Sequence, residues 1–339
     1  MNQIPKQFVI CAVAWSIARV ASAQPAPMAT LRVDISNSVF YVNDTGDYSK
    51  LATSAAVSPN QASKDFGTFT FIGDIVAVNG KPAKGTWTAR AIIVSLTSNI
   101  VQGGASQGPS QAIADTIRGN IVDMYWEIQQ ADGTPVGSIM AAGLTRGSPP
   151  PGAPLDMTGD NMTITGGTGA FVGMRGQVGV IKIVSARGAS VTEDPAYRRI
   201  NGGGDRSYVF QLIPLITPEV ALTASGPAIV HSSDFNLVSP AKPASAGEIL
   251  TLFAYGLGPT LPAVDPGQPF PAAPAKANSP ISLTVGGQEA NVLYAGGYPG
   301  SIDGYQVNFR VPDGLSSGLT AVRLTSAWIG GREVKLAVK

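Results

Sequence analysis

Residues 161–176 read NMTITGGTGAFVGMRG, and this glycine-rich stretch decides between two fold classes. Glycines at this density occur in the phosphate-binding turn of dinucleotide-binding folds, where G-x-G-x-x-G follows a strand and opens a helix. Gly167 and Gly169 fit the first two positions, but Val172 occupies the third. The residues that follow are rich in glycine and β-branched side chains, so we expect no helix whose N-terminus could bind a phosphate.

The alternative is a tight corner between two strands. Glycine accepts positive φ angles and lets backbones approach closely, as such corners require. We therefore expect a structural role for the glycines of this stretch, namely Gly166, Gly167, Gly169, Gly173 and Gly176.

The composition of the chain favours β-structure. Its 339 residues are enough for two domains, each with its own core. Only 13% of the residues are charged, while 40 glycines and 26 prolines favour short strands and turns over long helices. The expected fold class is all-β.

Residues 1–23 have the pattern of a secretory signal peptide. Lys6 precedes an apolar run over residues 8–18, and Ala21-Ser22-Ala23 forms a small-x-small cleavage site. The run is too short to span a bilayer, which takes about 20 apolar residues. We expect a secreted protein, extracellular, periplasmic or at the cell surface, without a membrane span after cleavage.

The charge balance and the scarce cysteine and histidine exclude several kinds of site. The chain has 23 basic and 22 acidic residues, so nothing steers it toward nucleic acid. Signal cleavage would remove Cys11, the single cysteine, and His231 is the single histidine. No metal site and no cofactor are expected, and no catalytic residue is identified. His231 lies near Ser232 and Asp234, but such close sequence neighbours do not form a triad, and a surface histidine is expected.

Eight strand-like segments follow one another between Leu31 and Ile216. Asn79-Gly80 and Asp132-Gly133 separate pairs of them, and both dipeptides suit the positive φ angles of tight hairpins. Eight antiparallel strands suffice for a small closed barrel. We predict such a barrel over residues 24–216.

Several ionisable residues in these strands are candidates for binding a ligand. Asp123, Tyr125 and Glu127 share one face of a strand, opposite an apolar face that includes Trp126. In the lumen this row could act as general acid or base, but alternation alone does not say which face is inside. Asp74 and Arg90 each interrupt an apolar strand, so each either lines the lumen or lies on the solvated face.

A second β-domain is expected after a linker at residues 217–225. Residues 226–339 contain about seven short strand candidates, typical of a sandwich. Gly286-Gly287 and Gly330-Gly331 are each expected to form a two-residue hairpin turn.

The sequence GGTGAFVGMRG of residues 166–176 resembles the GGTGxFxxARG signature of the barrel family that includes dirigent proteins and allene oxide cyclase. Met174 stands where that pattern has alanine. The resemblance implies an eight-stranded antiparallel barrel whose lumen holds a small hydrophobic molecule. It also matches Arg175 to the motif arginine, which implies either that Arg175 orients a ligand oxygen or that it holds the corner by hydrogen bonds.

Residues 226–339 resemble the immunoglobulin-like domain at the C-terminus of many large secreted bacterial proteins. The resemblance is carried by GEIL at 247–250, GLGP at 256–259, VLYAG at 292–296 and YQVN at 305–308. Such domains are generally accessory, which implies an immunoglobulin-like β-sandwich that spaces, presents or attaches its partner domain.

These observations give two main hypotheses of function. The first is a secreted bacterial protein that acts as a binding or extracellular structural module without hydrolytic chemistry. The second is a barrel isomerase or coupling-control protein for a small hydrophobic metabolite. A third, carbohydrate adhesion through exposed aromatics such as Trp328 or Tyr298, depends on composition alone. The sequence does not predict an oligomeric state.

Overall fold

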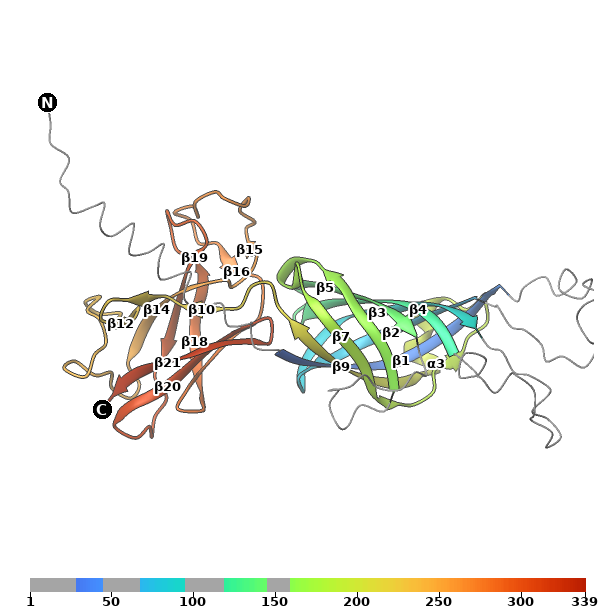
Figure 1. Ribbon diagram of the computed structural model, residues 1–339, viewed down its shortest axis with the longest axis horizontal. Coiled ribbons are helices and arrows are strands. Elements are labelled where there is room, and N and C mark those ends of the chain that lie inside the picture. Colours follow the sequence, from blue (N-terminus) through green and yellow to red (C-terminus); the bar gives the residue numbers. More distant parts are fainter. Residues whose placement is uncertain (1–28, 45–67, 95–118, 145–158) are drawn as a thin grey trace, which may run out of the picture.

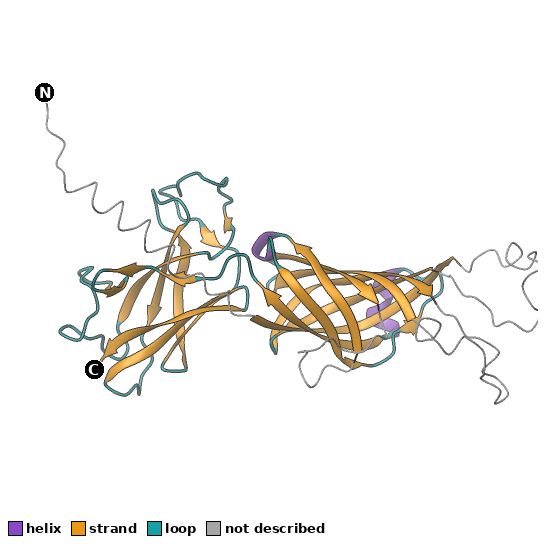
Figure 2. Cartoon of the chain, in the orientation of Figure 1, coloured by secondary structure: helices purple, strands orange, loops and turns teal. Residues whose placement is uncertain are grey.

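The computed structural model describes residues 29–44, 68–94, 119–144 and 159–339. The predicted signal peptide and the proline-rich segment at 147–154 lie outside these ranges. The described chain forms two β-domains that lie next to each other along the long axis of the molecule, with only short helical turns (Figures 1 and 2). The predicted all-β class is confirmed.

The N-terminal domain is a closed antiparallel barrel of eight strands. Its strands are β1 (Ala29–Asp44), β2 (Thr68–Val78), β3 (Lys81–Val94), β4 (Gly119–Gln130), β5 (Pro135–Leu144), β6 (Gly159–Gly167), β7 (Arg175–Ile183) and β9 (Gly204–Ile213). Each pairs with the next in this order, and β1 closes the barrel by pairing with both β2 and β9. A two-residue strand, β8 (Arg187–Gly188), runs parallel to β1. The predicted eight-stranded barrel is confirmed.

The two ends of the barrel differ. Tight connections join β2 to β3, β4 to β5 and β6 to β7 at one end, here called the hairpin end, which faces the second domain (Figure 1). Asn79 and Gly80, with φ of 49° and 74°, form the first of these turns. The β1–β2, β3–β4, β5–β6 and β7–β9 connections leave from the opposite end, the loop end, and of these only β7–β9 lies within the described residues.

Large side chains fill the middle of the barrel. Trp87, Trp126, Tyr208 and Phe210 are fully buried, and neighbouring rings in this group are 4.9–5.9 Å apart between centroids. Trp87 pairs directly with Trp126 across β3 and β4, so both indoles project inward from adjacent strands. Toward the loop end the inward positions of the same walls carry smaller residues, Ala89, Ala91 and Ala141.

The glycine-rich stretch turns β6 into β7. The two strands are antiparallel, and the short connection between them, residues 168–174, contains the three-residue 3-10 turn η4 (Gly169–Phe171). Gly169 and Gly173 have φ of 60° and 72°. At Gly176 an added Cβ would lie 2.0 Å from the carbonyl oxygen of Gln211, so a side chain there would displace the backbone of β9. No phosphate-binding helix begins within this stretch.

The first strands of the second domain lie within residues 217–225, which were expected to form a linker. Its strands are β10 (Glu219–Val220), β11 (Leu222–Thr223), β12 (Gly226–Pro227), β13 (Ile229–His231), β14 (Ile249–Tyr255), β15 (Thr260–Leu261), β16 (Lys276–Ala277), β17 (Ile281–Val285), β18 (Gln288–Gly297), β19 (Gly304–Arg310), β20 (Gly318–Ser326) and β21 (Ile329–Val338). Val220 of β10 is buried in the core of the second domain, so this strand belongs to that domain and not to a linker.

One sheet curls around the second core. Its main path is β10-β14-β19-β18-β17-β20-β21, with β13, β15 and β16 attached, and the terminal strands β10 and β21 contact each other. The sheet is therefore nearly closed and barrel-like, and a two-sheet immunoglobulin-like sandwich is not confirmed.

One of the two predicted Gly-Gly hairpins is placed wrongly. Gly286-Gly287 does form the turn between β17 and β18, with φ of 60° and 80°. The β20–β21 turn is instead Ala327-Trp328, and Gly330 and Gly331 lie inside β21. Glycine is needed at Gly331 because a Cβ there would lie 1.8 Å from the carbonyl oxygen of Pro218.

The tip of this β20–β21 hairpin contacts the hairpin end of the barrel. Ala327 and Ile329 belong to the buried cluster of the barrel core, and Trp328 packs against it. Two hydrogen bonds support this contact: Gln130 Nε2 donates to the carbonyl oxygen of Asn278 at 2.7 Å, and Asn278 Nδ2 donates to that of Pro135 at 3.0 Å. The second domain thus covers one end of the barrel.

Candidate functional site

Three phenylalanines cluster on the inner face near the loop end of the barrel. Phe69 and Phe71 pair with Ala91 and Ala89 of the inner face, and Phe40 pairs with Phe71. Their ring centroids are 5.7–6.4 Å apart, and Phe71 continues the contact to Trp87 at 6.1 Å. The inner wall at this end is therefore aromatic, and the side chains of the cluster are only partly buried.

Arg206 is placed on the same inner face by the alternation of β9. It shares its side of the strand with Tyr208 and Phe210 and pairs with buried Ile35 of β1. The guanidinium carbon lies 5.5 Å from the ring centroid of Phe71 and 5.3 Å from that of Trp87. Both distances are within the range of a cation–π contact.

The polar groups around this contact are incompletely satisfied. The side chain of Arg206 has no ion pair or hydrogen bond within the part of the chain that the structure describes, and its Nε atom is buried. The indole N–H groups of Trp87 and Trp126 are also buried without a hydrogen-bond acceptor in those residues. An unmade hydrogen bond at a buried donor costs about 1–3 kcal/mol. All three donors belong to residues of the inner face of the barrel.

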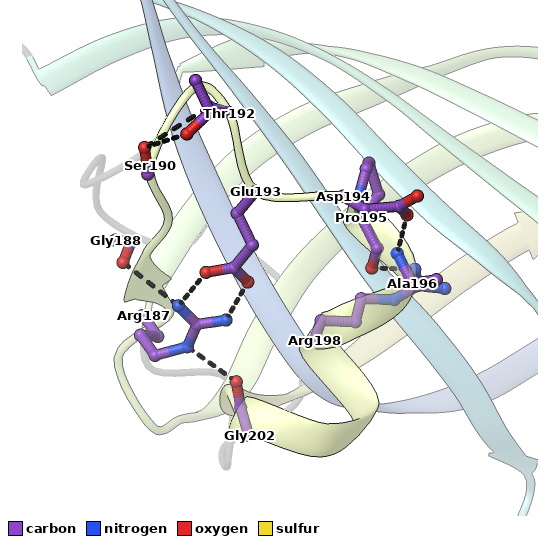
Figure 3. Close-up of polar contacts among 10 residues, drawn as sticks. All are labelled: Arg187, Gly188, Ser190, Thr192, Glu193, Asp194, Pro195, Ala196, Arg198 and Gly202. Carbon is purple, nitrogen blue, oxygen red and sulfur yellow. Dashed lines mark hydrogen bonds and ion pairs between the residues drawn. The ribbon is translucent and has the colours of Figure 1, made fainter.

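The connection between β7 and β9, residues 184–203, is fastened by its own polar contacts (Figure 3). Arg187 donates to both carboxylate oxygens of Glu193, at 3.0 and 2.5 Å, and its Nε donates to the carbonyl oxygen of Gly202 at 2.8 Å. The hydrogen bond from Arg187 lowers the pKa of Glu193. We call this segment the strap, and it contains η5 (Pro195–Tyr197) and α3 (Arg198–Asn201).

Asp74 fixes the strap to the outer wall of the barrel. It accepts hydrogen bonds from Arg198 Nη2 at 2.5 Å, from Arg199 at 2.7 and 3.0 Å, and from Asn37 Nδ2 at 3.1 Å. Burial alone would raise the pKa of Asp74, but the hydrogen bonds from Arg199, Asn37 and Arg198 outweigh it and lower the pKa. Because β9 starts directly after the strap, this anchor helps to hold the strand segment that carries Arg206.

The other ionisable candidates from the sequence lie on the outer wall. Arg90 and Asp123 form an exposed ion pair at 3.1 Å, Tyr125 is 46% exposed and Glu127 is exposed. The two faces of β4 therefore alternate as the sequence pattern indicates, and the face that carries Trp126 is the inner one. The structure does not bring these four residues, or Asp74, into the lumen, and it leaves their role as ligand contacts a prediction.

Arg175 lies exposed at the corner between β6 and β7. Its Nη1 donates to the carbonyl oxygens of Met174 at 2.9 Å and Thr165 at 3.3 Å. These bonds correspond to the corner-holding role, the second of the two expected for it.

Arg206 was not among the candidate residues predicted from the sequence, although the sequence pattern around it indicates an inward position. In the segment RSYVFQL of residues 206–212, every second residue from Arg206 onward lies on the face of Tyr208, Phe210 and Leu212. A cation that alternates in phase with buried aromatic residues indicates an inward charge.

His231 is buried, which corrects the expectation of a surface histidine. Its Nδ1 lies 2.5 Å from Glu248 Oε1, and its Nε2 lies 3.2 Å from the carbonyl oxygen of Lys242. Burial opposes ionisation of Glu248, but hydrogen bonds from His231 and from the backbone of Ser245 lower the pKa of its carboxyl group. The pair joins β13 to the start of β14 and has no serine nucleophile in its hydrogen bonds.

A pocket of about 290 Å³ lies where the two domains meet. Ala170 and Met174 line it from the barrel, and Leu257 and Tyr305 line it from the second domain. Burial raises the pKa of Tyr305 to about 12, and its hydroxyl donates to the carbonyl oxygen of Gly258 at 2.5 Å. The pocket wall is mostly apolar, and its tyrosine hydroxyl already has a partner.

Comparison with protein-family models, curated proteins and solved structures finds no match to this chain. Within the described ranges, none of the helices has the length and hydropathy that crossing a bilayer requires. Among these same residues, His, Asp and Glu side chains form no group of three or more that could hold a metal ion.

Proposed function

We propose that this protein is an exported two-domain binding protein whose barrel holds a small, mainly apolar molecule at the loop end of its lumen. The observation that carries the proposal is the inward Arg206 side chain, which lies over Phe71 and Trp87 without a hydrogen-bonding partner in the described chain. The residue is half-buried and its Nε atom is fully buried, and natural proteins rarely leave a buried donor unsatisfied unless it has a function. The partly buried phenylalanine cluster beside it supplies apolar contact surface.

The sizes of the inward side chains along the barrel also favour a binding site at the loop end. The middle is filled by Trp87, Trp126, Tyr208 and Phe210, and the hairpin end is covered by the second domain. A ligand would therefore reach the inner face from the loop end. In this proposal the second domain, with an immunoglobulin-like accessory role, supports the barrel and links it to its surroundings.

The neutral fluorescent probe N-phenyl-1-naphthylamine tests this proposal. We expect saturable binding by the full-length secreted protein, with quenching of tryptophan fluorescence, because Trp87 adjoins the site. Ala91→Leu adds bulk to the inner face near Phe69 and should weaken binding, whereas Thr88→Leu on the outer face of the same strand should not.

Circular dichroism shows whether both variants keep their fold. Native mass spectrometry of the secreted protein should in addition detect a co-purified small molecule. Absence of saturable probe binding, or equal binding by Ala91→Leu and wild type, would contradict the lumen site and favour a purely structural module.

A further inference from the structure

We infer that the molecule bound in the barrel is an organic anion, with a carboxylate or similar oxyanion on Arg206 and a flat apolar body against the phenylalanine cluster. This inference rests on the proposed function and names the chemical class of its ligand. It follows from the surroundings of the guanidinium group, which has two aromatic rings within cation–π range and lacks an acidic partner in the described residues.

Arg206 carries a charge that no described residue neutralises. Arginine stays protonated in proteins, and Arg206 is half-buried with its Nε fully buried, a position in which a cation is normally paired. Acidic side chains on the outer wall near Arg206 already have partners: Asp74 binds Arg198 and Arg199, and Asp34 accepts hydrogen bonds from Arg32 and Ser207. None of them projects into the lumen, because their positions alternate with the inward residues of β1 and β2. The missing countercharge is therefore assigned to a ligand.

The shape of the guanidinium group determines which ligand group can bind it. Its N–H donors lie in one plane, while its faces can stack on aromatic rings. Phe71 and Trp87 both lie on one side of the Arg206 guanidinium group, within cation–π range and 6.1 Å from each other, so the N–H donors that point away from these rings are available to an acceptor. A carboxylate fits that plane with two parallel hydrogen bonds.

Other hydrogen-bond donors of the inner face lie beside Arg206. The buried N–H groups of Trp87 and Trp126 lack acceptors in the described chain. A lumen with a cation and unpaired donors favours a ligand rich in acceptors. The rings of Phe40 and Phe69 then provide the surface on which an aromatic or otherwise flat body can pack.

The experiment compares two probes with the same ring system, 2-naphthoate and neutral 2-naphthalenemethanol, by quenching of tryptophan fluorescence in the full-length protein. We expect wild type to bind the acid at least about tenfold more tightly than the alcohol, because charge-assisted bidentate bonds are the stronger class. This comparison needs no variant.

Arg206→Met removes the charge but keeps an unbranched side chain of similar length. It should weaken naphthoate binding by about tenfold or more and change binding of the alcohol by less than about twofold. Arg206→Lys should give an intermediate loss, since it keeps the charge but not the planar fork. Arg332→Met, an exposed position of β21 in the second domain, makes the same charge change outside the proposed site and should leave both affinities unchanged.

The possible results distinguish failure of the anion inference from failure of the proposed binding function. Equal affinity of wild type for acid and alcohol, or an equal loss of both in Arg206→Met, would overturn the anion inference while lumen binding stands. If neither probe binds wild type, the proposed binding function fails together with the inference.

Discussion

Arg198 Nη2 lies 2.5 Å from Asp74 Oδ1, a contact that joins residues 124 positions apart and holds the strap against the outer wall of the barrel. Both side chains are largely buried, with 6% and 12% exposed, whereas Arg199, the second arginine on Asp74, is 60% exposed. Asp74 and Arg198 therefore form a buried ion pair, and Arg199 is a second, solvent-exposed partner of Asp74.

Replacing Asp74 with asparagine should destabilise the protein by about 2–3 kcal/mol. Removing one member of a fully buried pair costs about 3–5 kcal/mol, and the exposure of Arg199 reduces this value. Arg198 would be left buried with its hydrogen bond to the carbonyl oxygen of Pro195. Urea unfolding of wild type and variant measures the difference.

Asp123→Asn is the matched control for this change. It removes the same charge from the outer wall, but its ion pair with Arg90 is exposed, so the expected loss is below about 1 kcal/mol. Equal losses in the two variants would show that the strap is not anchored through Asp74.

The Asp74 anchor should also make stability depend on pH. The folded-state pKa of Asp74 is lowered, so the stabilisation is complete above the unfolded-state pKa of about 3.9 and is lost as the pH falls through the folded-state value. The difference in unfolding free energy between wild type and Asp74→Asn should therefore narrow below about pH 4. Other carboxyl groups with lowered pKa, such as that of Glu248, affect both proteins equally. A difference that stays constant down to about pH 3 would contradict this assignment.

Local patterns predicted the barrel well because its determinants are local. Alternation with a period of two and the Asn79-Gly80 turn are properties of neighbouring residues, and eight segments became eight strands. Which face is inward depends on closure of the whole sheet. The row Asp123, Tyr125 and Glu127 therefore could not be oriented from sequence alone.

The second domain shows the limit of the same reasoning. Gly331 looks like a turn residue in sequence, but it is required where β21 passes close to Pro218, a contact between distant segments. The actual turn uses Ala327 and Trp328 at positive φ, which local propensity disfavours and the contact with the barrel explains. The strap anchor likewise depends on Arg198 and Asp74, far apart in the chain.

The close approach of β7 and β9 at Gly176 makes a sharp prediction for an alanine substitution. Gly176→Ala places a Cβ 2.0 Å from the carbonyl oxygen of Gln211 at φ of 140°, so we expect a loss of about 3 kcal/mol or more, or failure to fold. Gly80→Ala has φ of 74° but open space around the added Cβ, and should cost only about 1 kcal/mol. Thermal unfolding of both variants compares the two effects. Similar losses would mean that backbone angle alone, and not the approach of β9, determines the need for glycine.

The β20–β21 turn gives the last prediction, because Trp328 combines an unfavourable backbone conformation with a favourable contact. Its φ is 63°, which costs a residue with a Cβ about 1–2 kcal/mol, and its side chain packs against the barrel core. Trp328→Ala loses the packing and keeps the strain, so we expect destabilisation by about 2 kcal/mol, less than for a fully buried tryptophan.

Trp328→Gly loses the same packing but relieves the strain, and should be more stable than Trp328→Ala by about 1 kcal/mol. Leu319→Ala, at a 65% exposed position of β20, is the control for loss of an apolar side chain and should be nearly neutral. We expect differential scanning calorimetry of the four proteins to show stability that decreases in the order wild type, Trp328→Gly, Trp328→Ala, with Leu319→Ala close to wild type. A Trp328→Ala protein as stable as wild type would instead indicate that this indole is free to bind an external partner such as a carbohydrate.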